Sequence, residues 1–283
     1  MKKILFKGVG SAVPTPFDEN GVNISEFRKF LQFQIDNNVD ALIVCGTTGE
    51  SSTMTRDEKI IAINCALEVA NEKIPVIVGT GSNNTREAIE MSEIAERLGA
   101  NGILVVTPYY NKTTQRGLIA HYKDIAESVS LPIILYNVPS RTGVNIEPQT
   151  CLELSKIDNI VAIKEASGDL SQIAQTINLC RDNLKVYSGN DDQIIPILSL
   201  GGIGVISVLS NLYPKYVHNM VYNYLDGNCT KEEAIEKIKQ NSRHYAKRQY
   251  TFFNHQLPIV WFETDYNNFN NTIEKVESYI ENN

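Results

Sequence analysis

Short apolar runs alternate with amphipathic segments through most of this 283-residue chain. The runs recur at intervals of roughly 25 residues, the spacing expected when each strand is followed by a helix. Because they are almost continuously apolar, they are typical of parallel strands that are covered on both faces. Eight runs are predicted to be strands: residues 10–13, 41–45, 75–78, 103–106, 132–136, 161–164, 185–187 and 204–208.

Segments with helix-start signals separate these runs. Thr55-Arg56-Asp57-Glu58 has the form of a capping box, and residues 25–27, 84–87 and 167–170 open further helices. Eight strands within about 210 residues fit a closed (β/α)8 TIM barrel better than an open doubly wound sheet. The open sheet would usually carry a Gly-x-Gly-x-x-Gly turn after its first strand, and that turn is missing.

The alternating pattern ends near residue 226. Thr230 and Glu233 have the spacing of a second capping box, which should open a charged helix running toward Gln249. We therefore expect the barrel over residues 1–226 and a C-terminal helical region over residues 227–283, atypical after about residue 254.

Composition and charge narrow the classes of partner. Lys and Arg number 26 against 33 Asp and Glu, and the net charge of −7 argues against a nucleic-acid or anionic-membrane surface. The five cysteines lack disulfide or metal-ligand spacing, which favours a reduced compartment. Because no apolar run has the length of a signal-peptide core or a membrane span, we expect a soluble cytoplasmic protein.

Lys164 is the most informative side chain, because it ends an apolar strand. In a barrel of this type the active site lies at the carboxyl ends of the strands. Burial lowers the pKa of a lysine, and a neutral amine in such a place is a candidate Schiff-base nucleophile. Taken alone, a lysine at a strand end more often reaches solvent with its long stem.

Other strand ends supply hydroxyl groups and one arginine. Residues 46–51, Gly-Thr-Thr-Gly-Glu-Ser, resemble an anion-binding loop that suits a small carboxylate. Tyr136 ends the fifth run, where its hydroxyl can transfer protons near Lys164, and Arg141 follows on a loop, where it can bind a carboxylate. Each of these residues also has an ordinary structural interpretation as a turn, a packed ring or a surface charge. The histidines fall outside the strand ends, so no histidine catalysis and no metal site are expected.

Six segments together resemble the dihydrodipicolinate synthase branch of the pyruvate-dependent class I aldolases, a superfamily that also contains N-acetylneuraminate lyase. The resemblance covers about residues 6 to 226. The segments are GTTGES (46–51), VTPYYN (106–111), YNVPSRTG (136–143), VAIKEASG (161–168), SGND (188–191) and GGIGVISV (201–208).

The resemblance implies condensation of pyruvate with L-aspartate 4-semialdehyde to give 4-hydroxy-tetrahydrodipicolinate, on the route to diaminopimelate and lysine. No metal or organic cofactor is implied, and a homotetramer or homodimer is expected. Lys164 would form the Schiff base. Tyr136 would transfer protons together with Thr47 and with Tyr110 of a neighbouring subunit. Thr47, Thr48 and Arg141 would bind the substrate carboxylates. Gly189 and Ile206 would shape the pyruvate pocket.

Two other functions remain open at this point. The first is another pyruvate-dependent aldolase or lyase, acting on sialic or 2-keto-3-deoxy sugar acids. Sialic-acid lyases resemble this chain at the lysine and the tyrosine. They differ in having an apolar residue where Arg141 stands, and Gly-Ser-Thr-Gly-Glu in place of Gly-Thr-Thr-Gly-Glu. Both differences favour the synthase. The second is a barrel that binds small acids without catalysis.

Two departures from the family pattern are informative. The lysine-inhibition cleft of some members matches Ser51, Asn83, Glu87 and Tyr109 here, but Arg56 and Lys59 stand where sensitive enzymes have histidines. Added positive charge disfavours a cationic ligand, so weak or absent lysine inhibition is expected.

The tail is the second departure. It lacks the family's Asn-Pro-x-Pro-x-Lys segment and carries an Asn-rich run at residues 267–271, as an altered reading frame would produce. Ile273, Val276 and Ile280 retain the spacing of a short amphipathic helix.

Overall fold

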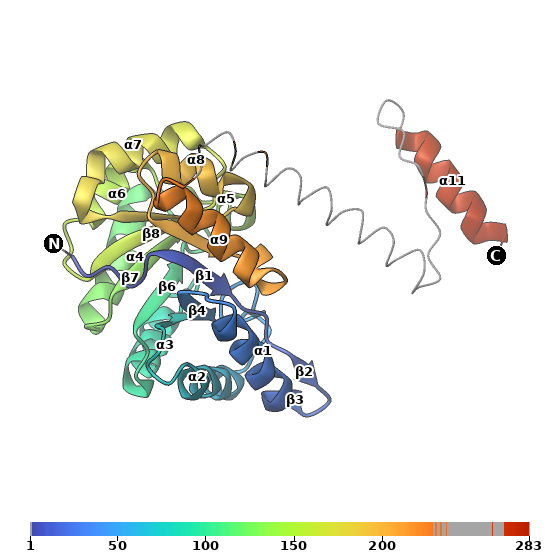
Figure 1. Cartoon of the computed structure of the whole chain (residues 1–283), viewed down its shortest axis with the longest axis horizontal. Helices are drawn as coiled ribbons and strands as arrows, with labels where there is room; N and C mark the ends of the chain where they lie inside the picture. Colours follow the sequence, from blue (N-terminus) through green and yellow to red (C-terminus); the bar gives the residue numbers. More distant parts are fainter. Residues whose placement is uncertain are drawn as a thin grey trace. The chain divides into compact units, whose positions relative to one another are not determined.

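Eight parallel strands close into a barrel (Figure 1) in the computed structural model, which describes residues 2–228, 230, 233, 236, 262 and 269–282. The order around the barrel is β1-β10-β9-β8-β7-β6-β5-β4, and β1 also pairs with β4. All eight predicted strands are confirmed, with ends that move by one or two residues. They are β1 (Gly8–Ala12), β4 (Ala41–Val44), β5 (Val76–Gly79), β6 (Gly102–Val106), β7 (Ile133–Asn137), β8 (Ile160–Glu165), β9 (Lys185–Ser188) and β10 (Gly204–Ser207).

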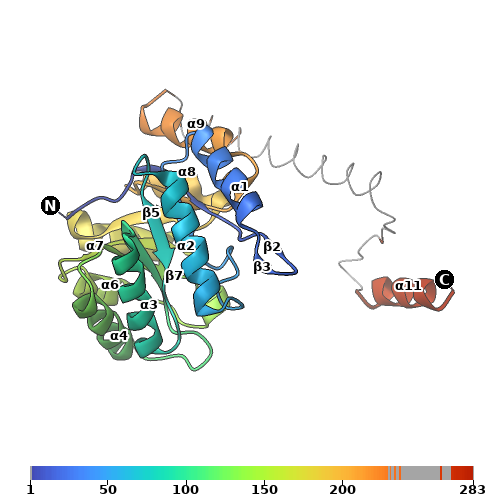
Figure 2. The same cartoon turned by 90° about the horizontal axis from the view of Figure 1, so that it is seen from below.

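Helices cover the outside of this barrel (Figures 1 and 2), which confirms the (β/α)8 architecture. They are α1 (Ile24–Asp36), α2 (Arg56–Ala70), α3 (Thr85–Leu98), α4 (Gln115–Ser128), α5 (Pro139–Thr142), α6 (Pro148–Leu154), α7 (Leu170–Cys180), α8 (Ile194–Ser199) and α9 (Pro214–Leu225). Short 3-10 turns lie at η1 (Arg181–Asn183), η2 (Asp191–Gln193) and η3 (Leu209–Asn211).

The predicted helix starts are confirmed with one correction. Thr55 and Glu58 form the full capping box of α2, and Asn84 caps α3. The cap of α1 is Asn23 rather than Ser25, because the Asn23 side chain accepts from the Glu26 amide. The sequence pattern missed the small hairpin of β2 (Phe17–Asp18) and β3 (Gly21–Val22).

Buried apolar side chains form two layers. One cluster lies between the strands and the surrounding helices, and the second fills the barrel interior. In the interior cluster, Phe6 and Tyr187 stack with ring centroids 4.4 Å apart, and the Tyr187 hydroxyl donates to the Phe6 carbonyl. The barrel is therefore a packed core, and the functional site has to lie at a strand end.

The C-terminal part forms a compact unit of its own. Ile235–Asn283 separates from Met1–Ala234, and the predicted terminal helix is confirmed as α11 (Phe269–Asn282). The Glu233 carboxylate accepts from the amide and hydroxyl of Thr230, as a capping box requires. A boundary at residue 227 stays a prediction. The helix expected to run toward Gln249, as well as His244 and His255, lies outside the described residues. Within the described part of the chain, no helix is both long and apolar enough to cross a membrane.

Candidate active site

Lys164 and Tyr136 lie side by side at the carboxyl ends of β8 and β7. The two residues are register partners, and the Lys164 amine lies 4.4 Å from the centre of the Tyr136 ring. Lys164 is only 5% exposed. Burial lowers its pKa to about 8, an effect that Asp191 opposes and the Arg141 charge reinforces. A substantial fraction of this amine is therefore neutral near physiological pH, as nucleophilic attack requires.

Tyr136 connects the amine to the loop after β4. Its side chain is 7% exposed, and burial raises its pKa, while a hydrogen bond with Thr47 and the charge of Arg141 act in the opposite direction. The structure thus brings Lys164, Tyr136 and Thr47 together, and the roles that the resemblance implies for them stay a prediction. A phenol in contact with an amine on one side and a hydroxyl on the other is placed to transfer protons.

Gly189 provides the space that the Lys164 side chain occupies. A Cβ atom at this position would lie 2.8 Å from Ala166 Cβ, 3.0 Å from the Glu165 carbonyl and 3.1 Å from Lys164 Cε. Ile206, on β10, is fully buried in the interior cluster. A side chain at position 189 would therefore displace its neighbours, and a larger one at Ile206 would overpack the interior.

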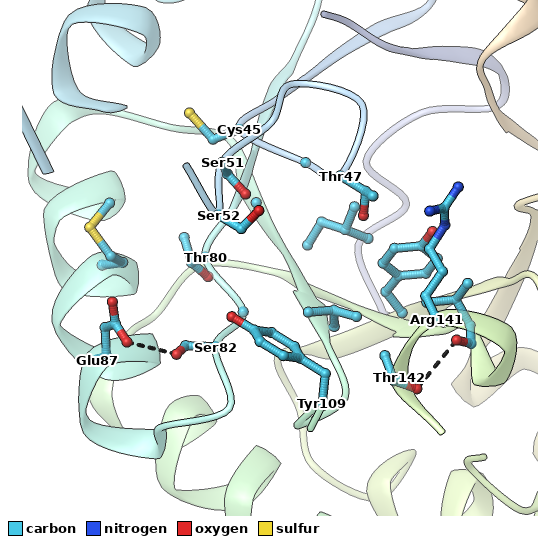
Figure 3. A pocket seen from close by; sticks show the side chains of 18 of the residues that line it. Cys45, Thr47, Ser51, Ser52, Thr80, Ser82, Glu87, Tyr109, Arg141 and Thr142 are labelled. Carbon is cyan, nitrogen blue, oxygen red and sulfur yellow. Dashed lines mark hydrogen bonds between the residues drawn. The ribbon is translucent and has the colours of Figure 1, made fainter. Parts of the chain in front are cut away.

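A cavity of about 550 Å³ opens beside these residues. Arg141, exposed on α5, lies at one end, and Ser82 and Glu87 lie at the other, with the Tyr109 ring between them in the view of Figure 3. Lys164 and Thr48 are not among the lining residues. The lining is Cys45, Gly46, Thr47, Ser51, Ser52, Met54, Lys59, Gly79, Thr80, Gly81, Ser82, Glu87, Met91, Leu104, Val106, Tyr109, Tyr110, Tyr136, Val138, Arg141 and Thr142.

Tyr110 differs from the other site tyrosine. It is 89% exposed, and its backbone φ of 67° lies in the left-handed region that a non-glycine residue seldom adopts. A ring with this exposure has little contact with its own chain. Tyr110 lines the same cavity as Tyr136, but its ring stays largely open to solvent.

Three of the four positions matched to a lysine cleft line the cavity, namely Ser51, Glu87 and Tyr109. Asn83 does not line it. Glu87 accepts a hydrogen bond from Ser82 at 2.8 Å.

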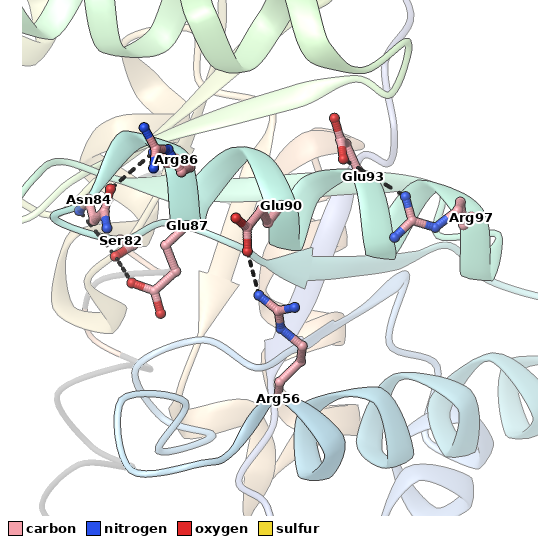
Figure 4. Close-up of polar contacts among 8 residues, drawn as sticks. All are labelled: Arg56, Ser82, Asn84, Arg86, Glu87, Glu90, Glu93 and Arg97. Atoms are coloured by element: carbon pink, nitrogen blue, oxygen red, sulfur yellow. Dashed lines mark hydrogen bonds and ion pairs between the residues drawn. The ribbon is translucent and has the colours of Figure 1, made fainter.

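The cations that replace histidines near this cleft differ in their surroundings. Arg56 reaches from α2 to Glu90 on α3, in the middle of an acidic row with Glu87 and Glu93 (Figure 4). Lys59 lines the cavity itself.

Two carboxylates near Lys164 had no role in the sequence-based hypothesis. Asp191 accepts hydrogen bonds from the Ser207 hydroxyl at 2.5 Å and from the Val208 and Leu209 amides at 3.1 and 2.9 Å. Glu165 is 1% exposed; burial raises its pKa to about 7, and hydrogen bonds from neighbouring side chains lower it. The sequence held one sign of this buried carboxylate, because Glu165 is a second charged residue at the end of an apolar run.

The described histidines lie away from the strand ends, as predicted. His121 is on α4, where burial lowers its pKa to about 4, and His218 is on α9. Among the residues that the structure describes, no three His, Cys, Asp or Glu side chains gather closely enough to hold a metal ion.

Comparisons with known proteins agree on one family. The profile of the Dihydrodipicolinate synthetase family matches residues 5–253. The chain is 56% identical over 226 residues to 4-hydroxy-tetrahydrodipicolinate synthase 1 of Clostridium acetobutylicum, which covers 80% of this chain and 77% of the relative. It is 54% identical over 233 residues to the synthase of a Thermoanaerobacter species, covering 82% and 78% of the two chains.

Solved structures give the same result. The dihydrodipicolinate synthase of Thermotoga maritima superposes with a TM-score of 0.80 at 43% identity, covering 90% of this chain and 86% of that one. A monomeric dihydrodipicolinate synthase variant superposes with a TM-score of 0.81 at 44% identity, covering 90% and 84%.

Proposed function

Because the chain belongs to the Dihydrodipicolinate synthetase family, we propose that it condenses pyruvate with L-aspartate 4-semialdehyde to give 4-hydroxy-tetrahydrodipicolinate, in diaminopimelate and lysine biosynthesis. The observation that carries this function is the buried Lys164 amine against the Tyr136 ring, at the strand ends where barrel enzymes act. No cofactor is required.

The chemistry begins with the neutral Lys164 amine, which attacks the ketone carbon of pyruvate. Loss of water then leaves a protonated imine, which withdraws electrons so that a methyl proton departs and an enamine forms. The enamine carbon attacks the aldehyde of the second substrate. The amino group of that substrate next displaces Lys164 from the imine carbon, which closes the ring and frees the enzyme. Tyr136 and Thr47 relay protons in these steps, a contribution typically worth about 10²–10⁴-fold.

Two carboxylate contacts fix the substrates. Backbone amides of Thr47 and Thr48, in the glycine-containing loop after β4, hold the carboxylate of pyruvate. Arg141, which is exposed and lines the cavity, receives the carboxylate of the semialdehyde. Gly189 and Ile206 shape the pyruvate pocket.

A second subunit completes the site. The exposed Tyr110 ring is free to enter the site of a neighbouring copy, where we propose that it joins the proton relay in a homodimer or homotetramer. We place the enzyme in the cytoplasm, where its substrates are metabolites.

Trapping of the imine tests the reaction. Borohydride reduction with pyruvate should fix a three-carbon adduct on Lys164, located by peptide mass mapping, and the variant Lys164→Arg should show none. Lys59, which lines the same cavity, is the internal control and should stay unmodified. Adduct on Lys59 alone, or on no lysine, contradicts the proposed function.

A further inference from the structure

Each of strands β7 and β8 ends with two consecutive residues that face opposite sides of the barrel wall. Tyr136 and Lys164 belong to the proposed chemistry, while Asn137 and Glu165, which follow them, are register partners on the other face. Asn137 is fully buried and Glu165 is 1% exposed. A buried carboxylate is costly unless hydrogen bonds satisfy it, so this pair needs an explanation that the reaction steps do not supply.

A direct hydrogen bond joins the two strands at this point. Asn137 Nδ2 donates to Glu165 Oε1 at 2.5 Å and to Asn145 Oδ1 at 2.9 Å. The other amide atom, Asn137 Oδ1, accepts from the Ile146 amide at 3.0 Å. Asn137 therefore binds β8 on one side and the segment that follows α5 on the other.

The second carboxylate oxygen extends the contacts to α7. Glu165 Oε2 accepts from the Ser167 hydroxyl at 3.0 Å, and the Gln172 side chain also bonds to this carboxylate. Gln172 and Asn145 exchange hydrogen bonds of 2.6 and 3.1 Å between their side-chain amides. Donors therefore reach Glu165 from β7, from the turn after β8 and from α7.

These bonds connect the elements that carry the site. They join β7 with Tyr136, β8 with Lys164, and the short segment that returns from Arg141 on α5. A network in a low-dielectric interior is rigid when every member is satisfied, and catalytic rates are sensitive to displacements of about 1 Å. We infer that Asn137, Asn145, Glu165, Ser167 and Gln172 form a positioning network that holds Tyr136 against Lys164. The inference rests on the proposed condensation.

The main test is Glu165→Gln, which keeps the side-chain volume but leaves a single acceptor oxygen where two oxygens now accept from Asn137, Ser167 and Gln172. Because only the geometry of the reacting groups changes, kcat should fall by roughly 10- to 100-fold with KM for pyruvate within about 3-fold. The rate of borohydride trapping at Lys164 should fall in parallel.

Asp40→Asn is the matched control. Asp40 is also a hydrogen-bonded carboxylate, with 22% of its side chain exposed; it accepts from the Val9 amide at 2.7 Å and the Tyr222 hydroxyl at 2.8 Å, but it precedes β4 at the opposite end of the barrel. This variant should lower the unfolding midpoint and leave kcat near wild type. Equal loss of kcat in both variants would mean general loosening of the barrel and would overturn the inference.

Two further variants keep the test decisive if Glu165→Gln folds poorly. Ser167→Ala removes one donor to the Glu165 carboxylate and the acceptor of the Asp169 amide, and should lower kcat by a few-fold with a modest fall in the unfolding midpoint. Adding Asn137→Asp to Glu165→Gln restores a donor–acceptor pair between positions 137 and 165 but removes the bond to Asn145 Oδ1, so it should recover only part of the lost kcat. Wild-type kcat in folded Ser167→Ala and Glu165→Gln refutes the network, whereas failure of wild-type protein to trap pyruvate refutes the proposed function instead.

Discussion

Lys164 occupies a position that favours reactivity at the expense of stability. An ammonium group is well solvated in water, whereas Lys164 is only 5% exposed and forms no ion pair within the part of the chain that the structure describes. The same desolvation that makes the amine nucleophilic therefore opposes folding. Gly189 is part of this arrangement, because a methyl group there would take the space of the lysine stem.

Replacement of Lys164 should separate its effect on activity from its effect on stability. The folded-state pKa of about 8 lies below the ordinary 10.5, so the unfolded chain binds the proton more tightly and burial costs stability at neutral pH. Lys164→Met should abolish activity and raise the free energy of unfolding by up to about 3 kcal/mol at pH 7. The gain should shrink as the pH rises from about 8 toward 10.5. Urea unfolding at several pH values measures it, and a destabilised variant at pH 7 contradicts it.

The sequence predicts Lys164 and Tyr136 because both end apolar runs, and the barrel brings all such ends to one face. Glu165 escapes the same reasoning. A glutamate beside a strand end has an ordinary solvent-exposed interpretation, and its partners Asn145 and Gln172 lie in a loop and a helix whose distance from β8 only tertiary structure defines. The proximity of Glu165 to Asn145 and Gln172 therefore produces no hydrophobic periodicity from which the sequence could predict it.

At the scale of the element, strands were more predictable than the short connections. The eight strands stand out because parallel strands are buried on both faces and read as continuous apolar runs. The hairpin of β2 and β3 has two residues per strand, too few for an alternating pattern. Helix α5 spans four residues within a segment of turn-forming residues, so its sequence indicates a loop.

Helices α2 and α3 determine how the enzyme should respond to lysine. Arg56 pairs with Glu90, whereas Lys59 lines the cavity that Glu87 and Tyr109 also line. Because like charges repel a cationic ligand, the inhibition constant for lysine should exceed about 1 mM in steady-state assays.

The variant Lys59→Gln isolates this repulsion. Loss of the charge should lower the inhibition constant for lysine while kcat stays unchanged. A micromolar constant for the wild-type protein, or equal constants for the two proteins, would show that Lys59 does not set the response.

At the scale of the whole molecule, subunit mixing tests whether Tyr110 acts in a second copy. Lys164→Arg and Tyr110→Phe should each be nearly inactive alone. In a mixed dimer, one site receives an intact Lys164 from one chain and an intact Tyr110 from the other. Co-expression of the two variants should therefore recover about a quarter of wild-type activity, because half of the dimers are mixed and each has one complete site.

Purified dimers of differently tagged variants provide the control for this mixing. The Lys164→Arg chain paired with a Lys164→Arg, Tyr110→Phe chain should stay inactive, since neither site has a lysine. Recovery that fails in true mixed dimers would place the action of Tyr110 within its own chain.

The pairing of β1 with β10 has a consequence for biosynthesis. Gly8 and Gly204 are register partners, so the second neighbour of the first strand is made almost 200 residues after it. At about 5–20 residues per second on the ribosome, β1 waits on the order of 10–40 s with one edge unpaired. Until β10 emerges, the incomplete barrel exposes the unpaired backbone N–H and C=O groups of an edge strand, which can pair with another chain. Nascent chains of this protein should therefore depend on chaperones more than the stability of the finished barrel suggests.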